Sequence, residues 1–145
     1  MAAPTELSPF HLAIPVRDLD ATRSFYCNRL GCSVGREAPR WIDFNFFGHQ
    51  VSVHLVESEE EDTIATNAVD GDRVPSRHFG VVLPWKEWQA LKARLEESGQ
   101  TFLIAPKVRF KGEPGEQGTF FLHDPSANAL EFKSFRDPSK LFASS

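Results

Sequence analysis

Four polar side chains of this 145-residue chain stand in otherwise apolar, strand-like runs, and all four are of types that bind divalent metals. They are His11, His54, His78 and Glu131. Two neutral imidazoles with one carboxylate suit Fe(II), Mn(II) or Zn(II) and leave coordination positions open for a substrate. Glu131 is the most informative of the four, because a carboxylate buried in an apolar strand requires a cation or a proton.

An internal repeat relates these residues to one another. His11 stands 67 residues before His78, and Gly31 stands 68 residues before Gly99. Each half of the chain follows the order strand, helix, strand, strand, strand. The sequence therefore predicts an α+β fold in which two βαβββ modules, residues 8–56 and 77–136, form an open curved mixed sheet around a metal-binding cleft.

The first module begins with a short apolar strand at 10–16. A helix capped by Asp18 or Asp20 is expected to run to Arg29, and Gly31 provides its stop signal. A short strand near 33–34 follows. Two further strands, 41–47 and 50–56, show period-2 alternation on both sides of a turn, which is typical of a hairpin.

The second module repeats this pattern from a strand at 77–84. A helix over 85–98 should end at Gly99 and bury one face, formed by Trp85, Trp88, Leu91 and Leu95. A strand at 101–104 and a loop at 106–118 come next. A hairpin with arms 118–123 and 129–135 completes the module.

Alternation along the last strand of each module decides which side chains face the cleft. In the second module an apolar set should meet the helix, which leaves Glu131 on the free face; that set is Leu130, Phe132 and Ser134. In the first module the same reasoning puts Gln50, Ser52 and His54 on the free face. Symmetry then predicts His54 as the counterpart of Glu131.

Further residues are candidates for contact with a substrate. His54 or His123 could act as the acid–base group, because imidazole titrates near neutral pH. Arg109 and Lys111 could hold an anionic substrate, and the glycines of their loop, 106–118, make it a candidate mobile lid. Phe44 is an expected substrate contact in an aromatic set that could line the cleft, which also includes Trp41 and Phe46.

Composition narrows the classes of partner and location. A net charge of −4 without a basic cluster argues against nucleic acid. No apolar run approaches the roughly 20 residues that span a bilayer, and the start of the chain lacks the layout of a signal peptide. Two cysteines, Cys27 and Cys32, are too few for a disulfide framework, so a reduced, cytoplasmic protein is expected.

The length favours one domain over residues 1–145. Residues 57–76 are rich in acidic side chains and are expected to form a solvated linker between the modules. Residues 137–145 form a short tail. The sequence leaves open whether the two modules pair within one chain or exchange between the chains of a homodimer.

Four segments carry a family resemblance: FHLAIPVRDL at 10–19, FYCNRLG at 25–31, RHFGV at 77–81 and DPSANALEF at 124–132. They resemble the vicinal oxygen chelate superfamily, which includes glyoxalase I, extradiol dioxygenases, and fosfomycin- and bleomycin-resistance proteins. Segments 41–50 and 108–117 are similar to those of short proteins described as predicted extradiol-type dioxygenases. The resemblance covers about residues 8–136.

This resemblance implies that paired βαβββ modules hold one metal through His11, His78 and Glu131. It implies an enzyme, and the leading expectation is an Fe(II) dioxygenase that acts on a small-molecule substrate with two adjacent oxygens. The alternatives are a glyoxalase-type lyase or isomerase that uses a divalent metal such as Zn, Mn or Ni as a Lewis acid, and a non-catalytic protein that sequesters its ligand. Glyoxalase I has a fourth ligand, a glutamate, at the position that symmetry assigns to His54.

Overall fold

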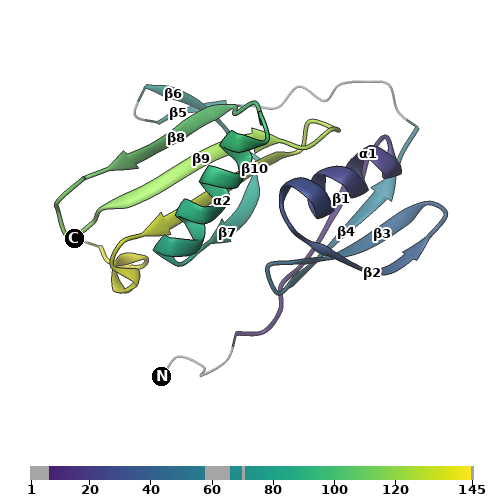
Figure 1. The fold of residues 1–145 in the computed structure, drawn as a ribbon, viewed down its shortest axis with the longest axis horizontal. Coiled ribbons are helices and arrows are strands. Elements are labelled where there is room, and N and C mark those ends of the chain that lie inside the picture. The colour runs from purple at the N-terminus through teal and green to yellow at the C-terminus, as the bar shows by residue number, and fades with distance from the viewer. Residues whose placement is uncertain (1–6, 58–65, 70, 145) are drawn as a thin grey trace. The chain divides into compact units, whose positions relative to one another are not determined.

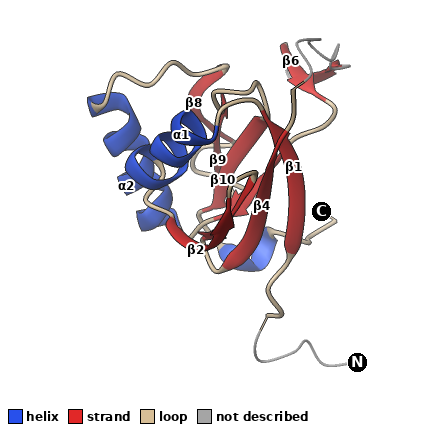
Figure 2. Cartoon of the chain, turned by 90° about the vertical axis from the view of Figure 1, so that its right-hand side faces the viewer, coloured by secondary structure: helices blue, strands red, loops and turns tan. Residues whose placement is uncertain are grey.

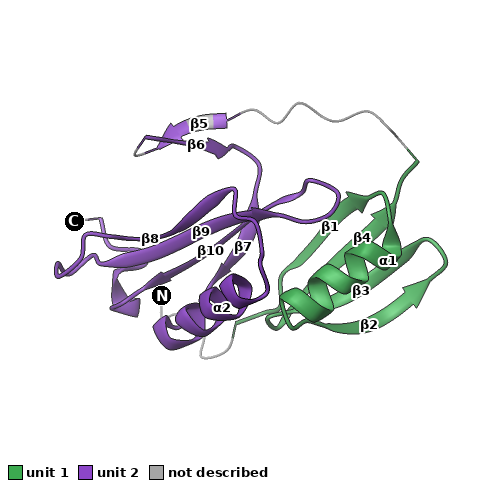
Figure 3. Cartoon of the chain, turned by 45° about the horizontal axis from the view of Figure 1, so that its top comes forward, with its two compact units in different colours: residues 1–58 green, residues 59–145 purple. Residues whose placement is uncertain are grey.

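The two halves of the sequence repeat fold with the same topology in the computed structural model, which describes residues 7–57, 66–69 and 71–144. The chain separates into unit 1, residues 1–58, and unit 2, residues 59–145 (Figure 3). Each unit contains a four-stranded mixed sheet, with the orders β1-β4-β3-β2 and β7-β10-β9-β8. The predicted α+β fold of two βαβββ modules is therefore confirmed.

Unit 1 begins with β1, which lies parallel to the last strand of its sheet, β4 (Figure 2). Its helix starts where the Asp18 carboxylate accepts a hydrogen bond from the Ala21 amide at 2.9 Å, and the chain leaves the helical region at Gly31, with φ 79°. The elements are β1 (His11–Val16), α1 (Leu19–Arg23), the π-helical η1 (Ser24–Arg29), β2 (Ser33–Ala38), β3 (Trp41–Phe46) and β4 (His49–Leu55).

Unit 2 carries the longer helix, α2, which lies across one face of its sheet (Figure 1). Its elements are β5 (Thr66–Val69), β6 (Asp72–Pro75), β7 (Phe79–Val82), α2 (Trp85–Glu97), β8 (Ile104–Arg109), β9 (Gln117–His123), β10 (Ala129–Phe135) and the 3-10 turn η2 (Pro138–Lys140). None of the helices in the described ranges has the length and apolar character needed to cross a membrane.

Trp88 is the centre of the core of unit 2. Its side chain is 1% exposed, and its ring lies 5.8 Å from that of Phe120. The indole Nε1 donates a hydrogen bond to the Phe132 carbonyl at 3.0 Å, which ties α2 to β10. Phe132 and its same-face neighbours Leu130 and Ser134 are fully buried. The predicted alternation is confirmed, and Glu131 points to the face of the sheet that α2 leaves open.

Two regions that the sequence suggested as irregular contain regular structure. In the predicted linker, β5 and β6 pair as an antiparallel hairpin over Thr66–Pro75, while residues 58–65 and 70 lie outside the described residues. Asp72 of this hairpin forms an ion pair with Lys107 of β8. The predicted linker thus contains a hairpin that the sequence did not suggest, and its role as a solvated linker between the modules stays a prediction.

The predicted loop at 106–118 is shorter in the structure, and its role as a mobile lid stays a prediction. Its first residues belong to β8, which pairs with β9 through Lys107, Val108 and Arg109. The remaining turn is tied down by Glu116, which is 7% exposed and accepts a hydrogen bond from the Gly112 amide at 2.9 Å. The Glu116 carbonyl accepts a further bond from the Arg136 amide at 2.9 Å.

The turn between β9 and β10 predicts a stabilising substitution. Asp124, 4% exposed, accepts bonds from the Ser126 and Asn128 amides at 2.8 and 2.9 Å and so fixes a turn in which Ala127 has φ 64°. A side chain at positive φ is strained, so Ala127→Gly should raise the free energy of unfolding by about 0.5–1 kcal/mol. The control Ala90→Gly, on the exposed face of α2, should lower it by about 1 kcal/mol. Urea denaturation measures both; a destabilised Ala127→Gly protein would contradict the account.

Candidate metal centre

A histidine and a glutamate meet on the open face of unit 2. His78 directly precedes β7, and Glu131 lies on β10, where it is the register partner of Gly80. Because side chains two residues apart on a strand share a face, His78 and Glu131 come together. His78 Nε2 lies 3.2 Å from Glu131 Oε1, with the two side chains 28% and 16% exposed. The parallel pairing of the first and last strands of the module thus creates this pair.

The hydrogen bonds around this pair fix the proton on the imidazole. His78 Nδ1 lies 2.7 Å from the Pro75 carbonyl oxygen. A carbonyl only accepts, so Nδ1 must donate, and in neutral His78 the Nε2 atom carries a lone pair. That lone pair faces a carboxylate oxygen, which is also an acceptor. The two atoms therefore require a shared proton or a cation between them.

The other oxygen of the carboxylate is also held. Thr119 of β9 donates its hydroxyl to Glu131 Oε2 at 2.6 Å, and Thr119 is 8% exposed. Phe121, 4% exposed, contacts the His78 ring edge-on at 5.1 Å between ring centroids and closes one side of the pair. Metal-binding histidines and carboxylates are typically oriented by such outer hydrogen bonds.

The separation of the two atoms fits one shared ion. Two ligands at about 2.0–2.2 Å from a metal lie roughly 2.8–3.6 Å apart at octahedral or tetrahedral angles, and the observed separation is 3.2 Å. Among the residues that the structure describes, no group of three His, Cys, Asp or Glu side chains is gathered. Unit 2 therefore brings two of the three predicted ligands together, and their role as ligands stays a prediction.

The third predicted ligand, His11, belongs to unit 1. It is the first residue of β1, and its side chain is exposed at the position that repeats His78. Its Nδ1 lies 2.8 Å from Gln50 Oε1 on the neighbouring strand β4. As in His78, the Nδ1 atom of His11 contacts a hydrogen-bonding partner in its own unit. The role of His11 as a ligand stays a prediction.

The predicted counterpart of Glu131 in unit 1 was wrong. In unit 2, Glu131 pairs with Gly80 of β7. The equivalent pair in unit 1 joins Ala13 to Ser52, and His54 pairs with Pro15, two residues further along β4. Ser52 is therefore the counterpart of Glu131, whereas His54 corresponds to Lys133 and is exposed. Alternation gave the correct face for His54 but not its position along the strand.

The three aromatic residues expected to contact a substrate lie in different surroundings in the structure. Phe44 is 1% exposed and stacks on Tyr26 at 5.0 Å between centroids, so its side chain belongs to the core beneath η1 and not to the open face. This corrects the prediction of Phe44 as a substrate contact. Phe46, 2% exposed, lies in the same core, whereas Trp41 is half-buried beneath the Arg36 guanidinium.

The basic candidates lie at the far end of β8. Arg109 and Lys107 share the face of Thr119 and Glu131, because Lys107 is the register partner of Thr119 and Arg109 that of Gln117. The Arg109 guanidinium also lies 4.9 Å from the centroid of the Phe110 ring. Lys111 is exposed in the turn beyond the strand. Arg109 therefore lies on the face of the sheet that carries His78 and Glu131, and Lys111 lies outside the sheet.

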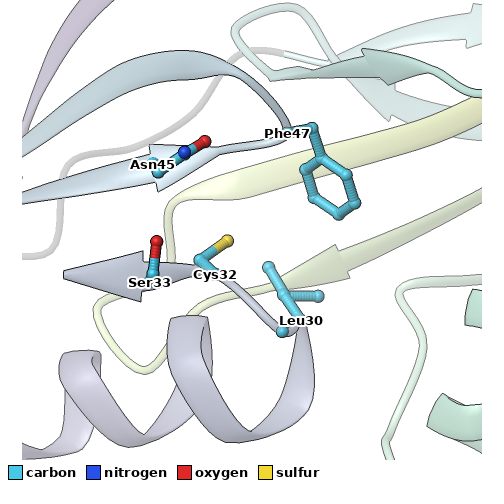
Figure 4. Close-up of a pocket in the computed structure, with 6 residues that line it drawn as sticks. Leu30, Cys32, Ser33, Asn45 and Phe47 are labelled. Atoms are coloured by element: carbon cyan, nitrogen blue, oxygen red, sulfur yellow. The ribbon is translucent and has the colours of Figure 1, made fainter.

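Two pockets lie among the described residues of unit 1. One, of about 190 Å³, lies between the end of η1 and the start of β2 and contains none of the predicted site residues (Figure 4). The other, of about 290 Å³, is lined by Asp43 and Gln50, together with Arg36 and His49. The second pocket is thus bordered by the glutamine that contacts His11.

Thr119 and Asp43 were not among the sequence candidates. Thr119 follows from the alternation of the second hairpin, because it is the register partner of Lys133, which shares the face of Glu131. Asp43 follows in the same way, as the register partner of Ser52. A hydroxyl or carboxylate on the free face of the strand next to a candidate ligand is the signal that would have found both.

We expect the hydrogen bond from the Thr119 hydroxyl to contribute measurably to stability. Thr119→Val keeps the shape of the side chain and removes the donor to Glu131. We expect a loss of about 1 kcal/mol in the free energy of unfolding at neutral pH, because the carboxylate is only partly buried and water can replace part of the bond. Thr101→Val, at an exposed position, is the control and should be near neutral. Equal stability of the two variants in urea denaturation would contradict the role of Thr119.

Comparison with known proteins gives one family match and similar relatives. The family model described as the Glyoxalase/Bleomycin resistance protein/Dioxygenase superfamily matches residues 8–132. The chain is 27% identical over 127 residues to catechol-2,3-dioxygenase of Bacillus subtilis (strain 168). The aligned region makes up 87% of this chain and 41% of that protein. The chain thus spans about two fifths of the length of this relative.

Solved structures show the same fold. A glyoxalase/bleomycin resistance protein/dioxygenase from Alicyclobacillus acidocaldarius is 36% identical, with a TM-score of 0.76 over 98% of this chain and 100% of that one. A genomically encoded fosfomycin resistance protein from Listeria monocytogenes is 18% identical, with a TM-score of 0.64 over 96% and 100% of the two chains. The second likeness concerns the fold alone.

Proposed function

Because the chain belongs to the glyoxalase/bleomycin resistance protein/dioxygenase superfamily, we propose that it is a metal-dependent dioxygenase. Its substrate is a small molecule with two adjacent oxygens, such as a catechol. His11, His78 and Glu131 hold one Fe(II) ion. When bound, Fe(II) supplies a redox centre that can accept both the adjacent oxygens of a substrate and dioxygen.

The facing acceptors of unit 2 are the observation that carries this proposal. His78 is held by the Pro75 carbonyl so that its Nε2 faces Glu131 Oε1 at 3.2 Å. A cation satisfies both acceptors at once, and the Thr119 hydroxyl keeps the carboxylate in place. His11 is the repeat equivalent of His78 and supplies the third ligand of a two-histidine, one-carboxylate set.

Other residues of the open faces have roles in binding and proton transfer. Arg109, on the face of Glu131, attracts an anionic substrate. His54, on the free face of β4, takes the proton that a catechol hydroxyl releases on binding, since a neutral imidazole has a nitrogen that can accept one. His54 is exposed, so the proton can pass from it to solvent.

The dioxygenase reaction is favoured over a glyoxalase-type reaction by the ligand set. A set with two carboxylates requires an acidic residue at the counterpart of Glu131, and the register places Ser52 there. The similarity to catechol-2,3-dioxygenase of Bacillus subtilis, at 27% identity, supports the same reaction. A glyoxalase-type lyase that uses Zn(II) or Ni(II) is the second candidate.

Oxygen uptake tests the reaction. The protein is purified and reconstituted with Fe(II) under nitrogen, mixed with a panel of catechols and then exposed to oxygen. We expect oxygen consumption together with ring-cleavage absorbance for the wild type, and neither for Glu131→Gln. Turnover of a hemithioacetal with Zn(II) or Ni(II), without oxygen consumption, would contradict the proposal and support the lyase.

A further inference from the structure

A chain of hydrogen bonds crosses three strands of unit 1 and ends at His11. Ser52 of β4 donates its hydroxyl to Asp43 Oδ1 of β3 at 2.5 Å. Gln50 of β4 donates Nε2 to Asp43 Oδ2 at 3.3 Å. The other end of the same amide, Oε1, lies 2.8 Å from His11 Nδ1 of β1. No function of Asp43, Gln50 or Ser52 follows from the ligand set described above.

The chemistry of Asp43 sets the direction of the whole chain. An ionised carboxylate only accepts hydrogen bonds, so the end of the Gln50 amide that faces Asp43 must be the NH2 group. The end that faces His11 is then the carbonyl oxygen, which also only accepts. His11 Nδ1 must therefore donate, and the lone pair of the neutral imidazole lies on Nε2. The charge on Asp43 decides the tautomer of His11.

The strands keep the members of this chain in place. Asp43 and Ser52 are register partners on β3 and β4, and His11 is the register partner of Gln50 on β1 and β4. Ser52 is 5% exposed, so the end of the chain away from His11 is buried. Regular strand pairing thus fixes the distances between the four side chains.

We propose that Gln50, oriented by Asp43, is a positioning residue that holds His11 in the tautomer with Nε2 available to a metal. This inference rests on the proposed function, in which His11 is a ligand. It goes beyond that function because it assigns to Asp43, Gln50 and Ser52 the role that the Pro75 carbonyl has for His78. The two units reach the same imidazole tautomer by different partners.

The tautomer of His11 in the metal-free protein tests this directly. Long-range proton–nitrogen NMR spectra distinguish protonated from unprotonated ring nitrogens of each imidazole. In the wild type we expect a proton on Nδ1 of both His11 and His78, and an unprotonated Nε2 on His11 only, because His78 Nε2 shares a proton with Glu131 when no metal is bound. Asp43→Asn should reverse this for His11 only. The new amide donates to Gln50 Oε1, the Gln50 amide turns over, and its NH2 group faces His11 Nδ1.

Matched variants separate this effect from a general disturbance. Asp20→Asn makes the same change at an exposed position of α1 and should leave the His11 spectrum unchanged. Gln50→Leu removes the partner of His11, and we expect the proton to redistribute toward Nε2. His78 is an internal control in every spectrum. An unchanged His11 tautomer in both Asp43→Asn and Gln50→Leu would overturn the proposal.

Zinc competition titration links the tautomer to binding. Asp43→Asn should weaken Zn(II) binding about 10–100-fold, the usual cost of losing an outer-shell partner. If His11→Ala leaves Zn(II) affinity unchanged, the proposed function of His11 fails, whatever the NMR result. If His11→Ala weakens binding strongly but Asp43→Asn alters neither the tautomer nor the affinity, the ligand role of His11 stands and the positioning role of Gln50 fails.

Discussion

Glu131→Gln is expected to remove tight metal binding while the protein stays folded. The substitution keeps the length of the side chain and an oxygen that can accept the Thr119 hydroxyl, but it removes the negative charge that faces His78 Nε2. Loss of a direct ligand should cost more than the roughly 10–100-fold in affinity that follows loss of an outer-shell partner. Zn(II) competition titration measures the affinity.

The stability of the metal-free variant supplies the second half of this prediction. Glu131 is partly buried, and removal of a buried charge offsets the loss of its contact with His78. We expect a free energy of unfolding within about 1 kcal/mol of the wild type. Glu97→Gln, at an exposed position of α2, is the matched control and should bind metal normally. Full metal occupancy in Glu131→Gln would show that this carboxylate is not a ligand.

Gly80→Ala is expected to be among the most damaging single changes in unit 2. A methyl carbon built on Gly80 overlaps the backbone carbonyl oxygen of Glu131, its register partner. The overlap involves backbone atoms on both strands, so relief requires β7 and β10 to move apart. We expect a loss of stability near the upper end of the roughly 1–3 kcal/mol that overpacking costs.

The same movement should reduce metal affinity, because His78 precedes β7 and Glu131 lies on β10. Gly35→Ala is the matched control: its added methyl would lie 3.5 Å from the Asp43 carbonyl oxygen, an ordinary contact. Urea denaturation and Zn(II) titration compare the two variants. Wild-type stability and affinity in Gly80→Ala would contradict the close approach of β7 and β10.

The faces of the sheets were predictable from sequence because strands alternate with a period of exactly two residues. Leu130 and Phe132 are apolar and Glu131 between them is not, so the buried face of β10 follows at once, and its burial against α2 agrees. The internal repeat was also predictable, because equivalent positions of the two modules carry the same residue types. His11 and His78 open equivalent strands in two modules of the same topology.

Position along a strand could not be obtained in this way. Alternation assigns both Ser52 and His54 to the free face, and only the pairing of β1 with β4 shows that Ser52 is the counterpart of Glu131. Phe44 was misplaced because an aromatic residue suits a core and a cleft equally well. Its stacking on Tyr26 decides for the core.

Other differences between prediction and structure concern strands whose sequences show little alternation of apolar and polar residues. β8 contains Pro106, Lys107 and Arg109, and as the outermost strand of its sheet it pairs with β9 on one side only. An edge strand has less apolar surface to bury, so its sequence resembles a loop. The hairpin of β5 and β6 has the same character, with Asp72 and Arg73 in its second arm.

Anomalous scattering from crystals loaded with Zn(II) tests the central claim most directly, because it locates the metal without reference to any activity. The account predicts one peak between His78 and Glu131, at about 2.0–2.2 Å from Nε2 and from a carboxylate oxygen, with His11 as the third protein ligand. A fully loaded protein whose metal lies elsewhere, with His78 and Glu131 in direct contact and no peak between them, would contradict it.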